Sequence, residues 1–294
     1  MNSSRRRFIQ TAVAVPAFAG LGMTAVPAVP AFAADGAEST DIANSADAAN
    51  GNVRFRLGLA SFTFRSFDFT RAVQLTRRAG LVPICINRIH LPMDSVEGQR
   101  AATAEATRSA GLDLYACGVV PMNSPADVVN AFQYARAIGA ETIVAMPRPE
   151  LLPLVETHVK ETGKYIAIHN HLTGSYPTLD AIMELVGSLD KRIGICVDVG
   201  HLVRNGVDLV KSIHDCKERI YDIHLKDVTE ASHQGRECVC GHGVLDIPGC
   251  LQALIDIGYD RVAAFEYEVN AGDPMPGLME SVGYVRGVLR MIGG

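Results

Sequence analysis

A regular alternation of short apolar runs with longer segments of helical period constrains the fold more than any other feature of this sequence. Eight apolar runs are predicted to be strands, at residues 57–61, 82–86, 112–120, 142–146, 165–168, 193–197, 220–225 and 261–265. Each is followed by a predicted helix, at residues 69–79, 95–110, 125–138, 150–162, 178–189, 208–216, 248–257 and 275–291. Eight strand–helix units in about 240 residues match the number and size of a (β/α)₈ barrel. We therefore predict an α/β protein with a single TIM-barrel domain over residues 54–294.

A doubly wound parallel sheet is the alternative arrangement of the same elements. Its dinucleotide-binding members carry a glycine-rich turn after the first strand, and the sequence has no such turn after residues 57–61. The near-even spacing of the apolar runs also favours a closed barrel. No linker or charge block divides residues 54–294, which favours one domain over two.

The first 34 residues have the features of an export signal. Ser4 to Gln10 read SRRRFIQ, which is a twin-arginine pattern, and a modestly apolar run follows as far as Pro30. Ala31-Phe32-Ala33 is a small-x-small cleavage site. Residues 1–34 are therefore predicted to be a twin-arginine signal peptide, and the polar residues 35–53 a flexible linker. We accordingly expect an exported, periplasmic protein, and the sequence leaves open whether the leader is cleaved.

The charge of the chain bears on its partners. The formal net charge is −5, and removal of residues 1–34 takes away three arginines and no acid, so that the remainder carries −8. An acidic body without a basic stripe argues against a nucleic-acid partner. The seven cysteines are an odd number, and several lie inside apolar runs, so they do not suggest a disulfide framework. The oligomeric state, a homo-oligomer included, stays open.

Four potential metal ligands stand at or beside the ends of four consecutive predicted strands. They are His169, Asp198, His224 and Glu266. Because the carboxyl ends of all strands in a parallel barrel share one rim, we expect these side chains to converge. Singly each has an ordinary explanation, such as helix capping for Asp198 or an arginine partner for Glu266. Two imidazoles and two carboxylates together suit one Mn²⁺, Zn²⁺, Co²⁺ or Fe²⁺ ion better than Ca²⁺ or Mg²⁺.

Six further polar side chains are expected on the same rim: His90, His171, His201, Arg204, Lys226 and Glu268. His171 and Glu268 lie two residues beyond a proposed ligand and share its face if the strand continues. A structural role for each is as plausible as direct contact with a substrate. The segment Cys238-Val-Cys240-Gly-His242 has part of a zinc-knuckle pattern, but it lacks a second ligand pair, which favours an ordinary loop.

Several of these segments together resemble one family. DVGHLVRNGVD, DIHLKD, GHGVLDIPG and AFEYE are similar to segments of the xylose isomerase-like TIM barrels, in particular exported members of the sugar phosphate isomerase/epimerase group. The resemblance runs from about residue 55 to the end. It implies one divalent metal ion held by Glu, Asp, His and Glu, and Asp198, His224 and Glu266 match three of these positions. The fourth carries His169 in place of the glutamate, which in sugar epimerases also transfers a proton.

The resulting hypothesis is a metal-dependent isomerase or epimerase that abstracts a proton next to the carbonyl of a sugar or keto-sugar, by way of an enediolate. The candidate catalytic residues are Glu266, His171, His201 and Lys226, and the candidate substrate contacts are His90, Arg204 and Glu268. A small-molecule carbohydrate is the expected partner. A lyase or hydrolase of 3-keto-glycosides is the alternative within enzymes, and a non-catalytic periplasmic sugar-binding barrel is the alternative of another class. An endonuclease is disfavoured by the acidic charge.

Overall fold

The computed structural model describes residues 53–293, and its central feature is a closed barrel of eight parallel strands. In barrel order the strands are β1 (Arg56–Ala60), β10 (Val262–Phe265), β7 (Ile220–Leu225), β6 (Ile193–Asp198), β5 (Tyr165–His169), β4 (Thr142–Pro147), β3 (Asp113–Met122) and β2 (Pro83–Ile86). Each coincides with one of the eight predicted runs. The predicted α/β TIM barrel is therefore confirmed, and the doubly wound sheet was the wrong alternative.

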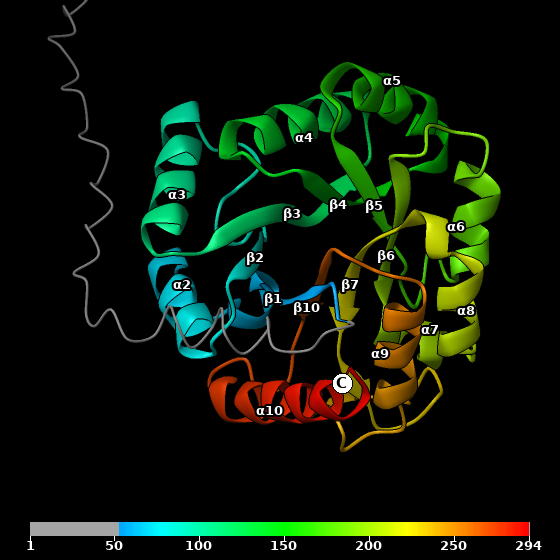
Figure 1. Ribbon diagram of the computed structural model, residues 1–294. Helices are drawn as coiled ribbons and strands as arrows, with labels where there is room; N and C mark the ends of the chain where they lie inside the picture. The colour runs from blue at the N-terminus through cyan, green and yellow to red at the C-terminus, as the bar shows by residue number, and fades with distance from the viewer. Residues whose placement is uncertain (1–52, 294) are drawn as a thin grey trace, which may run out of the picture. The chain divides into compact units, whose positions relative to one another are not determined.

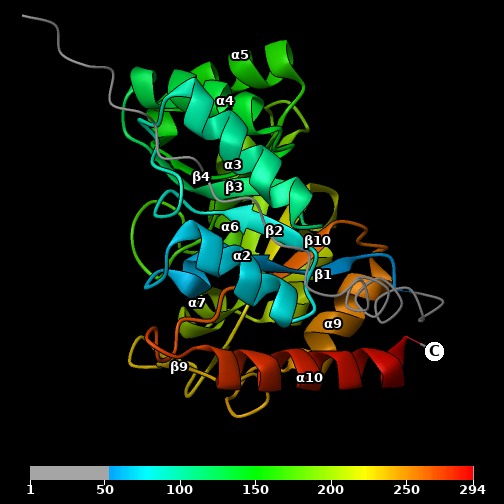
Figure 2. The ribbon, with the colours of Figure 1, turned by 90° about the vertical axis from the view of Figure 1, so that its left-hand side faces the viewer.

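Helices lie around the outside of the barrel (Figure 1). They are α2 (Phe69–Arg78), α3 (Glu97–Ser109), α4 (Pro125–Ile138), α5 (Leu152–Thr162), α6 (Leu179–Val186), α8 (Leu209–Asp215), α9 (Ile247–Asp256) and α10 (Met275–Ile292). The last of these runs beside α9, as Figure 2 also shows. None of the helices in residues 53–293 combines the length and the apolar composition that crossing a membrane requires.

The ends of these helices follow from local chemistry, as α4 illustrates. The Ser124 hydroxyl accepts a hydrogen bond from the amide of Asp127, and Pro125 occupies the first turn, where no amide proton is needed. Gly139 ends the helix in the left-handed region at φ +78°, which a side chain would disfavour. A serine, a proline and a glycine therefore set both ends of this helix.

Two elements near the rim were not predicted. Helix α7 (Val199–Arg204) begins directly after β6, where we expected a loop before the helix at residues 208–216. The pair β8 (Asp227–Val228) and β9 (Glu237–Cys238) is antiparallel and stands apart from the barrel sheet. Both lie on the carboxyl side of barrel strands, so both shape the rim.

The described residues form three apolar clusters, of which the smallest contains Ala60, Val262 and Ala264. A large cluster of buried side chains fills the space between the strands and the helices. Inside the barrel lies a second cluster of small residues from five neighbouring strands: Cys85, Ala116, Val144, Ala167 and Cys196. The signal peptide predicted for residues 1–34 lies outside the described residues. The linker predicted for residues 35–53 does too, except for its last residue.

Candidate functional site

The structure brings the four potential ligands into one buried cluster. His169 ends β5, Asp198 ends β6, His224 lies in β7 and Glu266 directly follows β10. One donor atom from each lies within 4.8 Å of the other three, and all four residues are buried. The register of β6 against β7 pairs Asp198 with His224, which places the two side chains at the same level. Their juxtaposition is thus a direct result of barrel topology, and their role as ligands stays a prediction.

The two carboxylate oxygens of Asp198 have different surroundings. Its Oδ1 accepts a hydrogen bond of 2.7 Å from the backbone amide of His201 and so caps α7. Its Oδ2 remains directed to the cluster, 3.5 Å from His169 Nε2. The side chain of Asn170 holds the Asp198 backbone through both its amide and its carbonyl, at 2.8 and 3.1 Å. The capping explanation of Asp198 is therefore correct and leaves one oxygen for another partner.

The cluster contains buried polar atoms without a hydrogen-bond partner among the described residues. They are both ring nitrogens of His169, Nε2 of His224 and Oδ2 of Asp198. The Asp198 oxygen lies 2.9 Å from Lys226 Nζ, but without hydrogen-bond geometry. Buried polar groups of native proteins are nearly always satisfied, and a metal ion is one way of satisfying them. Imidazole nitrogens and carboxylate oxygens are suitable donors for a divalent transition metal ion, so the residues present fit such a site.

Lys226 connects the carboxylates of the cluster. Its ammonium lies 2.9 Å from Asp198 and Glu266, and 3.0 Å from Glu237 and Glu268. The side chain is only 2% exposed, so these interactions are little screened by water. Glu266 Oε2 also lies 3.0 Å from His224 Nδ1. One ammonium therefore faces four carboxylates, and the site keeps an excess of negative charge that favours a cation.

Charge and burial shift the pKa values of these groups in opposite directions. Burial alone would raise the pKa of the Asp198 carboxyl, but Lys226, His201 and His169 together outweigh burial and hold the pKa well below its usual range. The same holds for Glu266, where His224 and Lys226 outweigh burial. For Glu237 burial prevails over Lys226 and raises the pKa to about 8. The two proposed carboxylate ligands are thus ionised, as metal binding requires.

A cavity of about 710 Å³ opens above the cluster. It reaches His169 and Glu266 and includes three of the predicted rim residues, His171, His201 and Glu268. The rest of the lining comes from the first four strand ends: Phe62, Asn87, Arg88, Ile89, Val119, Pro121 and Met146. A molecule of sugar size in this cavity would therefore have polar groups on one side and mainly apolar groups on the other.

The rings of His171 and His201 lie together at this cavity, with centroids 4.3 Å apart. Burial lowers the pKa of His201 to about 4, and burial and the neighbouring His169 lower that of His171. Both imidazoles are accordingly neutral at neutral pH and can accept a proton.

Two of the predicted substrate contacts are not brought to the cavity. The ring nitrogens of His90 lie 3.0 Å from the Ser61 hydroxyl and 3.2 Å from the Phe64 carbonyl, both in the segment after β1. The guanidinium of Arg204 donates to the His233 carbonyl at 3.1 Å. Neither residue is among those that line the cavity. His90 follows β2 by four residues and Arg204 ends α7, so their place in the sequence put both near the rim but did not determine where their side chains point.

Glu237 is the main residue that the sequence did not predict at the site. It comes from β9, in the segment that lengthens the spacing between His224 and Glu266, and its Oε2 accepts the backbone amide of Glu268 at 2.9 Å. The length of the segment between His224 and Glu266 was the sequence feature that could have indicated a further residue at the site.

Comparison with known proteins agrees with the geometry. The family described as xylose isomerase-like TIM barrel matches residues 122–287, more than half of the chain. An inosose dehydratase of Geobacillus thermodenitrificans is 28% identical over 144 residues, which cover 43% of this chain and 48% of that protein. One from Lacticaseibacillus casei is 27% identical over 40% of this chain and 45% of its own length. The matched part thus spans about half the length of these curated relatives.

Solved structures share the fold. The IOLI protein "with a binding zinc atom" superimposes with a TM-score of 0.69 at 16% identity, covering 81% of this chain and 99% of that one. L-ribulose 3-epimerase gives a TM-score of 0.65 at 16% identity, covering 81% of this chain and 95% of that one. At such identities these similarities establish the barrel and nothing finer.

Proposed function

Because the chain belongs to the family of xylose isomerase-like TIM barrels, we propose that it is a divalent-metal-dependent isomerase or epimerase that acts on a sugar or keto-sugar. The observation that carries the proposal is the buried cluster of His169, Asp198, His224 and Glu266 beside a cavity with two neutral imidazoles. L-ribulose 3-epimerase and the zinc-bound IOLI protein share this barrel fold.

The four residues of the cluster would hold one Mn²⁺, Zn²⁺, Co²⁺ or Fe²⁺ ion. Metal bound there would supply Lewis-acid polarisation of the substrate carbonyl, which would favour loss of the neighbouring proton. Two nitrogen donors favour these metals over Mg²⁺. The replacement of the usual glutamate by His169 lowers the negative charge of the donor set by one, which leaves Asp198 and Glu266 as its charged members.

The remaining residues move or position protons. His171 and His201 are neutral and face the cavity, so either can remove the proton next to the carbonyl. Lys226 is not a base, because Asp198 and Glu266 outweigh burial and raise its pKa well above its usual value. Its ammonium instead fixes Glu266 and Glu268 at the edge of the cavity. This refines the catalytic role that the sequence predicted for Lys226 into a positioning role.

The fate of the proton decides the reaction class. Its return to the neighbouring carbon is isomerisation, and its return to the opposite face of the same carbon is epimerisation. Loss of a β-hydroxyl group instead releases water, and the curated relatives named inosose dehydratase favour this second candidate. The cluster and cavity serve all three outcomes, since each begins with the same proton abstraction.

Solvent exchange tests the proposal. The chain, loaded with Mn²⁺ or Zn²⁺, is incubated with a panel of keto-sugars and keto-cyclitols in D₂O, and products are analysed by mass spectrometry. Deuterium in a rearranged sugar supports isomerisation or epimerisation, and loss of water supports the dehydratase. A His171→Asn/His201→Asn variant should bind the metal but exchange at least 100-fold more slowly. Sugar binding without any exchange or product would refute the proposal and indicate a binding protein.

We further propose that the protein acts outside the cytoplasm. The support is the twin-arginine pattern at Ser4 to Gln10. Cell fractionation tests it: the wild-type chain should be exported, and an Arg5→Lys/Arg6→Lys variant should accumulate in the cytoplasm. Equal distribution of both would contradict the assignment.

A further inference from the structure

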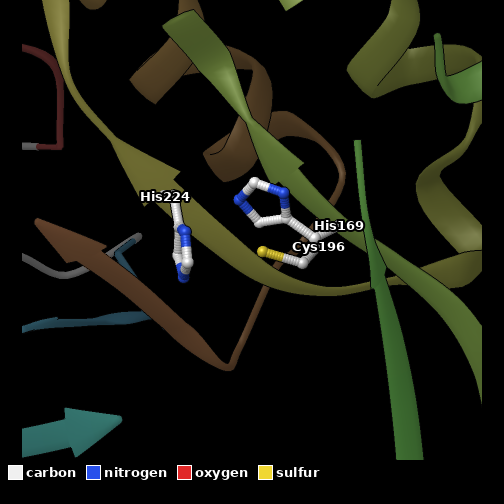
Figure 3. Close-up of side chains that lie close together, drawn as sticks. All are labelled: His169, Cys196 and His224. Atoms are coloured by element: carbon white, nitrogen blue, oxygen red, sulfur yellow. The ribbon is translucent and has the colours of Figure 1, made fainter. Parts of the chain in front are cut away.

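A second set of metal donors lies against the first one. His169, Cys196 and His224 each offer one atom, these atoms lie within 4.8 Å of one another, and all three residues are buried. Figure 3 shows the three side chains, from β5, β6 and β7, pointing toward one another inside the barrel. The two imidazoles belong to both sets, so Cys196 is the only member that the first set lacks.

Strand geometry explains why the two sets share their histidines. Cys196 and Asp198 are two residues apart on β6, so both face the barrel interior. The register pairs His169 with Cys196 and His224 with Asp198. The imidazoles therefore have the Asp198 carboxylate toward the rim and the Cys196 thiol one layer deeper.

His169 and His224 have ring nitrogens that a metal ion could bind. Both ring nitrogens of His169 and Nε2 of His224 are buried without a hydrogen-bond partner among the described residues. A neutral imidazole offers one acceptor nitrogen, and a metal ion can satisfy it. The replacement of a glutamate by His169 is what provides the second nitrogen beside Cys196.

In the metal-free chain the Cys196 thiol donates a hydrogen bond to a carboxylate beneath it. Cys196 Sγ lies 3.8 Å from Asp222 Oδ2, and the Tyr115 hydroxyl donates to the other oxygen of Asp222 at 3.0 Å. Asp222 Oδ2 also lies 3.5 Å from His224 Nε2. Asp222 is fully buried, so its contacts are confined to these groups and their surroundings.

We propose that Cys196 is a sulfur ligand through which this centre binds thiophilic divalent ions, with His169 and His224 as the nitrogen ligands. The proposal rests on the proposed metal site and adds a donor to it. Two nitrogens and one thiolate favour Zn²⁺, Co²⁺ and Cd²⁺ over Mn²⁺. Ligation replaces the thiol proton by the metal ion, and the proton is released to solvent.

The absorption spectrum of the Co²⁺-loaded chain tests the proposal. A cobalt–thiolate bond gives an intense charge-transfer band in the near ultraviolet, whereas nitrogen and oxygen ligands give none there. We expect this band in the wild-type chain with one equivalent of Co²⁺, and its loss in Cys196→Ser, which should still bind Co²⁺ through the carboxylate set. The affinity for Cd²⁺ should fall by about 10- to 100-fold in Cys196→Ser, while that for Mn²⁺ should change little.

Two matched variants serve as controls. Cys85→Ser changes another buried cysteine of the same interior cluster, outside both donor sets, and Cys240→Ser tests the Cys238-Val-Cys240 segment. Both should keep the band. Bound Co²⁺ without a band in the wild-type chain, or a band that survives in Cys196→Ser, would overturn the sulfur ligand and leave the proposed function intact. Failure of the wild-type chain to bind Co²⁺ at all would refute both proposals.

Discussion

Removal of the Lys226 ammonium is the perturbation whose consequences the structure determines most sharply. Lys226→Met keeps most of the length of the side chain and deletes the charge that faces Asp198, Glu237, Glu266 and Glu268 at 2.9–3.0 Å. The Asp198 side chain is fully buried and that of Glu266 is 7% exposed, so neither can be rehydrated in place.

The expected cost in the absence of metal is about 3–5 kcal/mol in the free energy of unfolding, the usual effect of removing one partner of a buried ion pair. Because Lys226 faces four carboxylates and not one, its removal could lower the free energy of unfolding by more than this. Glu268 is 30% exposed and can turn to solvent, and Glu237 can stay protonated because its pKa is already raised to about 8. These two responses keep the expected loss within that range.

A divalent metal ion should restore more stability to the variant than it adds to the wild-type chain. The ammonium repels a cation that shares the Asp198 and Glu266 oxygens with it, so its removal strengthens metal binding, and tighter binding stabilises the folded state further. Urea unfolding measured in EDTA and in excess Mn²⁺ gives both quantities for both chains.

Lys211→Met is the matched control, because Lys211 pairs with Asp215 on the surface of α8 and its side chain is 71% exposed. Its stability should change by less than about 1 kcal/mol, with or without metal. A loss below about 1 kcal/mol for Lys226→Met in EDTA, or an equal loss with and without Mn²⁺, would show that the ammonium does not neutralise the buried carboxylates.

Three further predictions concern the same site. Asp198→Ala and Glu266→Ala should each lose most of the bound metal in elemental analysis while circular dichroism still shows a folded barrel; full occupancy in both would contradict the donor set. His201 stays neutral in the folded chain down to about pH 4, whereas an unfolded histidine takes up a proton near pH 6.5. The folded state therefore binds fewer protons, and stability falls as the pH decreases through this window. His201→Gln should reduce the loss of metal-free stability between pH 7 and pH 5 by about 2 kcal/mol in urea unfolding, and an unchanged pH dependence would count against the buried neutral imidazole. Gly200→Ala would place a Cβ 2.8 Å from two carbons of Lys226 and should lower the free energy of unfolding by about 1–3 kcal/mol. Gly98→Ala is the control, because its Cβ meets no atom within 4 Å. Equal melting temperatures for the two variants would show that Lys226 is not held in place.

The barrel was predictable because buried parallel strands are continuous apolar runs, and the carboxyl ends of such strands must share a rim. This made the convergence of His169, Asp198 and His224 predictable before any coordinates. Helix α7 was missed because it begins directly after β6 and is only six residues long, which is too short for helical periodicity to appear.

Other features of the site depend on side-chain direction. His90 and Arg204 stand near the rim, yet their polar atoms turn to backbone carbonyls and a hydroxyl elsewhere. Glu237 reaches Lys226 from a loop whose path no sequence pattern fixes. Cys196 lies inside an apolar predicted strand, where a cysteine usually packs as a small apolar residue, although its spacing from Asp198 places both on one face of β6.

Elemental analysis of protein purified without a histidine tag is the decisive test of the proposed metal centre. We predict about one equivalent of a divalent transition metal in the wild-type chain and much less in a His169→Ala variant, because His169 belongs to both donor sets. No bound metal in either chain, even after reconstitution with Mn²⁺ and Zn²⁺, would contradict the account.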